Sequence, residues 1–183
     1  MPDFADRFYW KMLVVRCQVG DTHAIEELVS ECHPRLRSFI HKMLPGHAGV
    51  DDLTQEVWMD VFRNLPRLAE PGSFVPWVYQ IARARVFRML RRRRDRTVPL
   101  GEVDVADDHQ HDPEFTPEDA VRVHAALDQL PPEHREVLLL RFIEDMSYED
   151  IAAVAECPLG TVRSRLHNAK RLLRQVLERG EQP

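Results

Sequence analysis

Residues 147–177 read SYEDIAAVAECPLGTVRSRLHNAKRLLRQVL, and the spacing of their apolar and polar side chains decides the fold of the second half of the chain. Ser147 can cap a short helix, with the Asp150 carboxylate near the positive end of the helix dipole. A tight turn follows at Cys157, and a longer helix then runs to about Glu178. This order is typical of a helix-turn-helix, which presents its second helix to the major groove of DNA.

The longer helix is expected to have one apolar and one polar face. At about 100° per residue, Val162, Leu166 and Ala169 fall on one stripe, which Leu173 and Val176 continue. The side chains able to hydrogen-bond to base edges and phosphates lie away from this stripe. They are Arg163, Ser164, His167, Asn168, Lys170 and Arg171. Glu156 stands where many such turns have glycine, which predicts a strained backbone at the turn.

The charges of the chain are arranged in blocks, although the formal net charge is −5. Residues 83–96 hold eight arginines and one acid, whereas residues 102–119 hold eight acids and no lysine or arginine. Residues 158–177 hold five basic residues and no acid. This pattern predicts two basic surfaces separated by an acidic tether. No apolar run approaches the roughly 20 residues that cross a bilayer, and the first residues do not resemble a signal peptide, which indicates a cytoplasmic protein.

Helical periodicity extends over nearly the whole chain, and no stretch shows convincing strand alternation. We therefore predict an all-α protein of two small helical domains joined by a flexible acidic linker. The expected domains are residues 1–97 and 118–183, with the linker at 98–117. The expected helices are 3–18, 21–44, 51–64, one from 73 into the arginine run, one ending near 129, 132–144, 147–155 and 159–178. Pro34 is expected to kink or split the second of these.

Segments in both halves of the chain carry a family resemblance. DDLTQEVWMDVFRNL, residues 51–65, and SFVPWVYQIARARVFRMLRRRRDR, residues 73–96, resemble region two of extracytoplasmic-function sigma factors. In that family a D-L-x-Q-E-x-F helix precedes F-x-x-W-L-x-x-I-A-R-N-R and a basic tail. GTVRSRLHNAKRLL, residues 160–173, is similar to the recognition helix of region four, and VRCQVGDTHAIEELVSECHPRL, residues 15–36, is similar to the first region. The three motifs stand in the family's order.

The resemblance implies an alternative sigma factor, which is not an enzyme and needs no cofactor or metal. Such a protein binds core RNA polymerase and promoter DNA and is held in check by an anti-sigma factor. The expected polymerase-docking residues are Asp51, Asp52, Gln55 and Glu56. The loop at about 65–73 and the helix after it are expected to hold melted promoter DNA. The basic side chains for this task are Arg83, Arg85, Arg88, Arg91 and Arg92.

Within the melting segment two residues depart from the family pattern, and one has two interpretations. Ala84 stands where the family often has Asn, and Arg88 stands where Asp is common, so base selection through that Asn does not carry over. Trp77 could stack on a base. Its spacing with Ile81 on one helix face favours a core position instead.

Three other functions are compatible with parts of the sequence. A stand-alone helix-turn-helix repressor or activator fits the second half and leaves residues 51–65 without a task. A two-metal hydrolase could use Asp51, Asp52, Glu56 and Asp60, but helical spacing splits them between faces. Metal or redox sensing could use Cys17, His23, Cys32, His33, His109 and His111, although no spacing matches a structural zinc site. The three cysteines form no disulfide framework, and we expect buried thiols.

Overall fold

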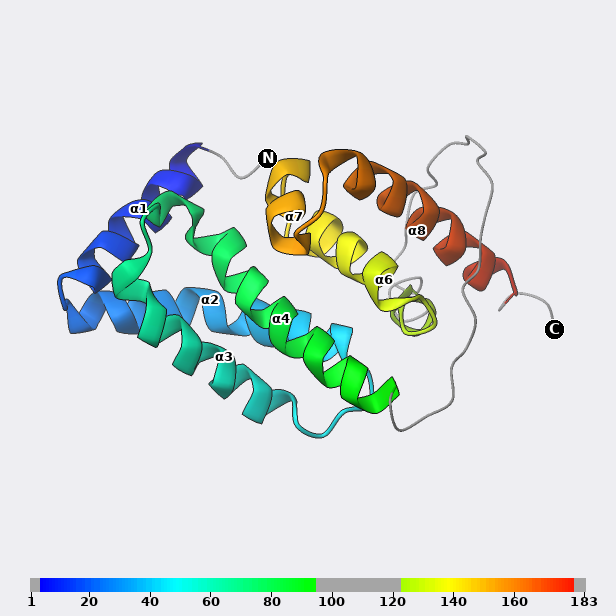
Figure 1. Cartoon of the computed structure of the whole chain (residues 1–183), viewed down its shortest axis with the longest axis horizontal. Helices are drawn as coiled ribbons and strands as arrows, with labels where there is room; N and C mark the ends of the chain where they lie inside the picture. Colours follow the sequence, from blue (N-terminus) through cyan, green and yellow to red (C-terminus); the bar gives the residue numbers. More distant parts are fainter. Residues whose placement is uncertain (1–3, 95–122, 180–183) are drawn as a thin grey trace.

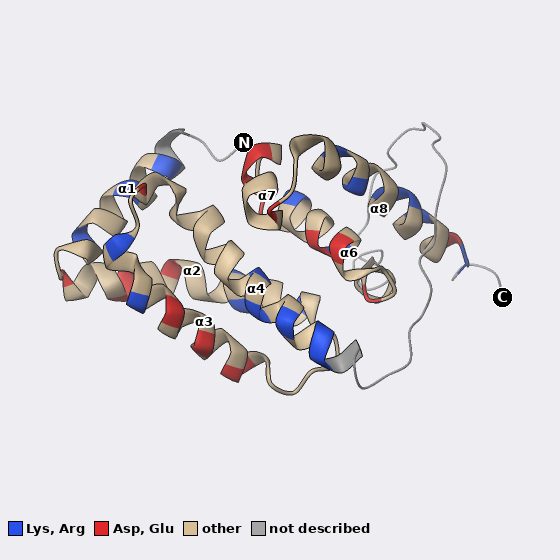
Figure 2. Cartoon of the chain, viewed as in Figure 1, with Lys and Arg blue, Asp and Glu red and all other residues tan. Residues whose placement is uncertain are grey.

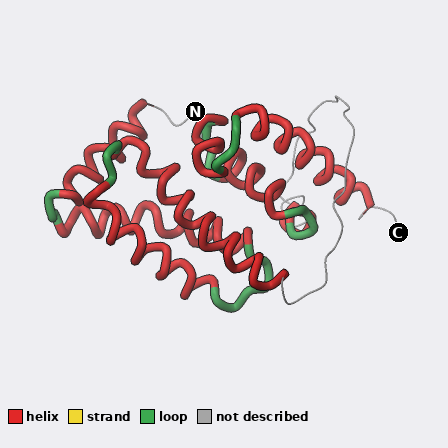
Figure 3. The backbone as a smooth tube through the Cα atoms, in the orientation of Figure 1, coloured by secondary structure: helices red, strands yellow, loops and turns green. Residues whose placement is uncertain are grey.

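A computed structural model describes residues 4–94 and 123–179 of the 183-residue chain. All regular structure in these two ranges is helical, as the red tube in Figure 3 shows, which confirms the predicted all-α class. The predicted linker, residues 98–117, lies outside the described residues. No helix in the described ranges is long and apolar enough to cross a membrane.

Residues 4–94, the described part of the first half, form four long helices, and their bounds follow the sequence signals closely. They are α1 (Phe4–Gln18), α2 (Thr22–Met43), α3 (Val50–Asn64) and α4 (Phe74–Arg94) (Figure 1). Asp21 caps α2, because its carboxylate accepts a hydrogen bond from the Ala24 N–H at 3.1 Å. Gly20, with a φ of +89°, makes the left-handed turn between α1 and α2.

The helix α2 continues through Pro34 as one helix and does not split there. Its buried stripe includes Leu28, Cys32, Leu36 and Phe39, on both sides of the proline. Packing of this stripe against the core holds the helix together, so tertiary contacts outweigh the hydrogen bond that proline cannot make.

Two short 3-10 turns lead from α3 to α4: η1 (Leu65–Arg67) and η2 (Pro71–Ser73). The Gln18 amide at the end of α1 donates to the carbonyls of Leu65 and Leu68, each at 2.9 Å. These bonds satisfy loop carbonyls and fix the loop against α1, so the start of α4 is held in a defined place.

The second half contains α6 (Pro132–Leu138), a π-helical turn η3 (Leu139–Ile143), α7 (Tyr148–Ala155) and α8 (Leu159–Arg179). The sequence predicted one helix over 132–144. In the structure its last turn widens, and the Glu144 N–H bonds to the Leu139 carbonyl, five residues earlier. The wider turn brings the Glu144 side chain into the protein interior, where it is 3% exposed.

The two halves pack against each other, with α4 lying along α7 and α2 reaching α6 (Figure 1). The sequence predicted two helical units on a tether and gave no sign of this interface. Buried residues of both halves form one continuous apolar cluster, from Leu13 and Val86 to Leu140 and Leu166. The interface is therefore part of the core, and it determines which polar side chains stay in contact with solvent.

Candidate nucleic-acid interface

The turn between α7 and α8 has the geometry that the sequence predicted. The Ser147 hydroxyl accepts from the Asp150 N–H at 3.1 Å and donates to the Asp150 carboxylate at 2.7 Å. Glu156 ends α7 in the left-handed conformation, with φ 51° and ψ 44°. The Cys157 N–H then bonds back to the Ala152 carbonyl at 3.2 Å. The predicted cap and the predicted strain at Glu156 are both confirmed.

The helix α8 buries the apolar stripe that the sequence predicted, but it exposes only part of the predicted polar set. Val162, Leu166 and Ala169 are buried on the inner side. Arg163, Ser164 and Lys170 are exposed, whereas His167, Asn168 and Arg171 are half-buried. Figure 2 shows basic residues along the length of α8. A row of hydrogen-bond donors with a rigid apolar backing is the arrangement that a helix needs to enter a major groove.

The exposed face of α3 carries the residues predicted to dock polymerase. Asp51, Asp52, Gln55 and Glu56 are all exposed, and α3 shows a row of acidic residues in Figure 2. The Arg37 guanidinium lies 2.7 Å from Asp51 and holds the pKa of that carboxyl below its ordinary value.

Two apolar side chains that the sequence analysis missed lie on this same surface of α3. Met59 is 61% exposed and Phe62 is 40% exposed. Both side chains follow the acidic residues at helical spacing. The sequence contained a signal for them, because neither Met59 nor Phe62 falls on the apolar stripe of Leu53, Val57 and Val61 that is buried in the structure. A surface that combines acidic groups with exposed apolar side chains is suited to binding a protein.

The five arginines predicted to hold melted DNA differ in their surroundings. Arg88, Arg91 and Arg92 are exposed on α4. Arg85 instead pairs with Asp60, its Nε lying 2.8 Å from the carboxylate, and also with Glu56. Arg83 turns toward the second half, where it pairs with a buried carboxylate. The exposed side chains can meet phosphates directly, whereas Arg83 and Arg85 would first have to exchange their present partners.

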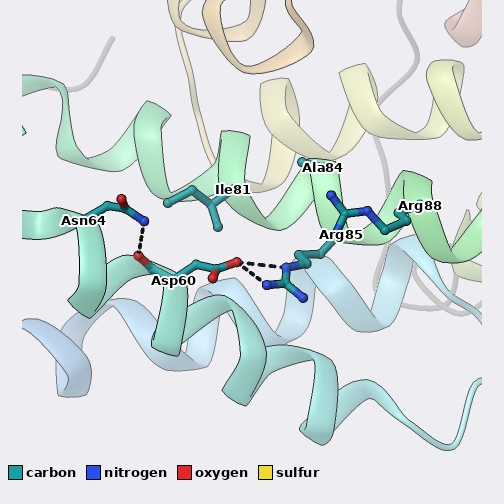
Figure 4. Close-up of a pocket in the computed structure, with 6 residues that line it drawn as sticks. All are labelled: Asp60, Asn64, Ile81, Ala84, Arg85 and Arg88. Carbon is teal, nitrogen blue, oxygen red and sulfur yellow. Dashed lines mark hydrogen bonds and ion pairs between the residues drawn. The ribbon is translucent and has the colours of Figure 1, made fainter.

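A cavity of about 320 Å³ opens between α3 and α4, around the paired Arg85. Figure 4 shows its lining and the contacts of Asp60 with Arg85 and Asn64. The lining residues are Asp60, Asn64, Ile81, Ala84, Arg85 and Arg88. Ala84, the small residue that departs from the family pattern, leaves room here, and the cavity is large enough for a planar ring.

Trp77 is half-buried and packs on the core, with its ring centroid 6.1 Å from that of Phe74. Phe74 is in turn stacked on Trp10 of α1 at 5.6 Å. These contacts favour the core interpretation of Trp77, because its ring already packs against the Phe74 ring and the core.

The residues considered for sensing do not form a cluster in the described ranges. Cys17 and Cys32 are buried, and burial raises the pKa of the Cys32 thiol to about 12. Within the described ranges no group of three or more His, Cys, Asp or Glu side chains is arranged to hold a metal ion. His109 and His111 lie outside the described residues.

Comparison with known proteins identifies two matching families. Residues 28–96 match sigma-70 region 2, and residues 120–173 match sigma-70, region 4. RNA polymerase sigma-H factor of Pseudomonas aeruginosa is 32% identical over 180 residues, which cover 92% of this chain and 93% of that protein. ECF RNA polymerase sigma-E factor of Escherichia coli K12 is 30% identical over 175 residues, which cover 87% and 90%. ECF RNA polymerase sigma factor SigE of Mycolicibacterium smegmatis is 36% identical over 166 residues, covering 86% of this chain and 64% of that protein.

Two solved structures share the fold. The complex of CnrH with the cytosolic domain of CnrY matches with a TM-score of 0.71 at 21% identity, covering 92% of this chain and 97% of the other. The co-crystal structure of the sigma factor RpoE with the anti-sigma factor NepR from Bartonella quintana matches with a TM-score of 0.68 at 24% identity, covering 84% and 96%. At these identities the likeness concerns the fold.

Proposed function

The chain belongs to the sigma-70 family, in its extracytoplasmic-function group, and from this premise we propose that three of its helices divide the work of a sigma factor. As an alternative sigma factor it binds core RNA polymerase and directs transcription initiation at specific promoters. In the proposed division, α3 docks on polymerase, α4 holds the melted strand and α8 reads the upstream duplex. The output is transcription, and the site of action is the cytoplasm.

The proposal for α3 rests on its exposed mixed surface. Asp52, Gln55 and Glu56 present acidic and amide groups to solvent, and Met59 and Phe62 extend the same surface with apolar area. Charges at such an interface set the rate and orientation of docking, while buried apolar contacts supply affinity. The surface therefore supports binding to a basic and apolar patch on polymerase.

The proposal for α4 rests on its exposed arginines and on the cavity beside them. Arg91 and Arg92 can follow the phosphates of a single strand, and Arg88 lies where the basic run meets the cavity. A base that leaves the stack needs a pocket with polar groups, and this cavity offers the Asp60 carboxylate and the Arg88 guanidinium. Base selection through an amide at this position does not carry over from the family, because Ala84 has no amide.

The proposal for α8 rests on the confirmed turn, which is the single observation that carries the DNA-reading role. With the Ser147 cap and the Glu156 turn in place, Arg163 and Ser164 lie near the start of an exposed helical face. Residues near the start of a recognition helix are those that reach base edges. A stand-alone regulator would use this same motif, but it would leave the region-2 match and the α3 surface without a task.

An anti-sigma factor controls the activity in this proposal. RpoE of Bartonella quintana was solved in complex with the anti-sigma factor NepR, and it shares the fold of this chain. A partner of this type can cover polar working surfaces on both halves at once. The area of an ordinary protein interface supplies far more binding free energy than exposed ion pairs do.

The direct test is a purified system with core polymerase. The protein should bind core enzyme in gel filtration and start transcription from a few promoters without an added nucleotide-driven remodeller. Asp52→Arg should weaken binding to core polymerase at least tenfold, whereas Glu26→Arg on α2, a matched charge reversal at an exposed acid, should not. Absence of core binding at micromolar protein would contradict the function, and equal effects of both variants would contradict the role of α3.

A further inference from the structure

An ion pair between α3 and α4 lies in the middle of the cavity that these two helices line (Figure 4). The Asp60 carboxylate accepts from the Arg85 Nε at 2.8 Å, and another N–H group of Arg85 pairs with Glu56. Because two acids of α3 hold it, the planar Arg85 guanidinium keeps one orientation. A guanidinium plane is a surface on which a nucleic-acid base can stack, and the apolar Ile81 side chain lies beside it in the lining.

One end of the cavity presents a hydrogen-bond acceptor. The Asn64 Nδ2 donates to the Asp60 carbonyl at 2.8 Å, which fixes the orientation of this amide. Within the described ranges no donor bonds to the Asn64 side-chain oxygen, and the side chain is exposed. This end of the cavity can therefore accept a hydrogen bond from an N–H group of a base.

The other end of the cavity presents only donors. In Figure 4 Asn64 and Arg88 lie at opposite ends of the lining, with the pair of Asp60 and Arg85 between them. Arg88 is exposed and pairs with no other residue of the described ranges. A guanidinium offers parallel N–H groups in a fixed fork, so this end is suited to two acceptors that lie side by side.

Ala84 keeps the space between the two ends open. It stands between Ile81 and Arg88 on the face of α4 that lines the cavity, and it has the smallest side chain of the lining residues. Its methyl group neither fills the volume of about 320 Å³ nor offers a hydrogen bond of its own. A base stacked here can therefore reach the acceptor at one end and the donors at the other at the same time.

The four bases differ in how well they match both ends. Guanine carries two neighbouring acceptors, O6 and N7, and an amino donor, N2, on the far side of its two rings. Adenine has an amino donor beside N7, so it cannot accept both N–H groups of Arg88. Cytosine and thymine are single rings with their hydrogen-bonding groups along one edge, so they cannot reach Arg88 and Asn64 together. Guanine alone satisfies both ends.

We propose that this cavity selects a guanine of the melted strand and that Arg88 is the residue that determines this choice. Its guanidinium donates to guanine O6 and N7, while the Asn64 oxygen accepts from the N2 amino group. The inference rests on the proposed role of α4, and it adds the base and the residue that reads it. Arg91, one turn further along α4, does not line the cavity and contacts phosphate without regard to sequence.

Selection from a randomised single-stranded DNA library tests the choice of base. The full-length protein bound to core polymerase should enrich strands with guanine at one position, and Arg88→Met should lose the preference at that position alone. Arg91→Met is the matched control, because it should weaken binding to all strands and keep the guanine. Enrichment of another base at the position that Arg88 controls, or a guanine preference that survives Arg88→Met, would overturn the inference while α4 still binds the strand. If the wild-type complex binds no strand, the proposed role of α4 is wrong, and the inference falls with it.

Base analogues in the selected strand test the two contacts separately. Replacing the guanine by 7-deazaguanine, which lacks the N7 acceptor, should weaken binding of the wild-type complex roughly tenfold and leave binding of Arg88→Met unchanged. Replacing it by hypoxanthine, which lacks the amino group, should weaken wild-type binding roughly fivefold and leave binding of Asn64→Ala unchanged. A loss that is the same in the wild type and in the matching variant would refute that contact.

Discussion

Replacing Glu156 with glycine and, separately, with alanine distinguishes the backbone from the side chain at the turn between α7 and α8. Glu156 has a φ of 51°, in the left-handed region where residues with a Cβ are disfavoured. Its carboxylate also accepts from Gln80 and lies 3.8 Å from Arg83. Both substitutions remove these contacts, but only glycine relieves the backbone.

The expected difference follows from two opposing free energies. A residue with a Cβ in the left-handed region costs about 1–2 kcal/mol, and glycine avoids this cost. The greater freedom of glycine in the unfolded chain offsets about 0.5–1 kcal/mol of that gain. Glu156→Gly should therefore be about 1 kcal/mol more stable than Glu156→Ala. In the Glu156–Arg83 pair that is lost, the Glu156 side chain is 64% exposed. The free energy of unfolding of Glu156→Ala should therefore lie within about 1 kcal/mol of that of the wild type.

Thermal and denaturant unfolding measure the effect. A gain of 1 kcal/mol should raise the midpoint of a chain this size by about 2–4 °C. Asp145 also has a φ of 51°, and aspartate enters this region more readily, so glycine should gain less over alanine there. If Glu156→Gly is no more stable than Glu156→Ala, the left-handed conformation assigned to this turn is wrong.

Three further predictions concern DNA, pH and the interface. Arg163→Ala should weaken binding to the upstream element by about 1–3 kcal/mol. Arg91→Ala should leave duplex binding unchanged and should lower the slope of log K against log salt concentration for open complexes by about 1. Footprinting and strand-opening assays measure the two steps separately, and equal effects of both variants on both steps would contradict the division of labour. Burial raises the pKa of Glu136 to about 7, so the folded protein binds a proton at this carboxyl more tightly than the unfolded chain does. The free energy of unfolding should therefore fall by up to about 3 kcal/mol as pH rises from about 4.5 to 7. Glu136→Gln should abolish that part of the pH dependence in denaturant titrations, and an unchanged slope would refute the assignment. Arg135→Ala should destabilise the chain by about 3 kcal/mol, since it leaves buried carbonyls without a donor, whereas the exposed Arg63→Ala should cost less than about 1 kcal/mol in the same titration.

Local signals in the sequence determined most of the secondary structure and the identity of the DNA-reading motif. Asp21 and Ser147 act as caps through bonds that span only three residues, and the stripe of Val162, Leu166 and Ala169 follows from the helical period. Such features depend on neighbours along the chain, so they can be predicted without knowledge of the fold. Pro34 marks the limit, because packing of distant helices decided whether α2 continued.

Only the tertiary structure decided which charged side chains are exposed and which are paired. In the sequence Arg83, Arg85 and Arg91 belong to one basic run, yet Arg83 pairs with Glu136 and Arg85 with Asp60, while Arg91 is exposed. The partners lie on other helices, Asp60 on α3 and Glu136 on α6. Their choice depends on how α4 packs against α3 and against the second half, and the free energy of a buried charge depends on that packing and not on the charges next to it in sequence.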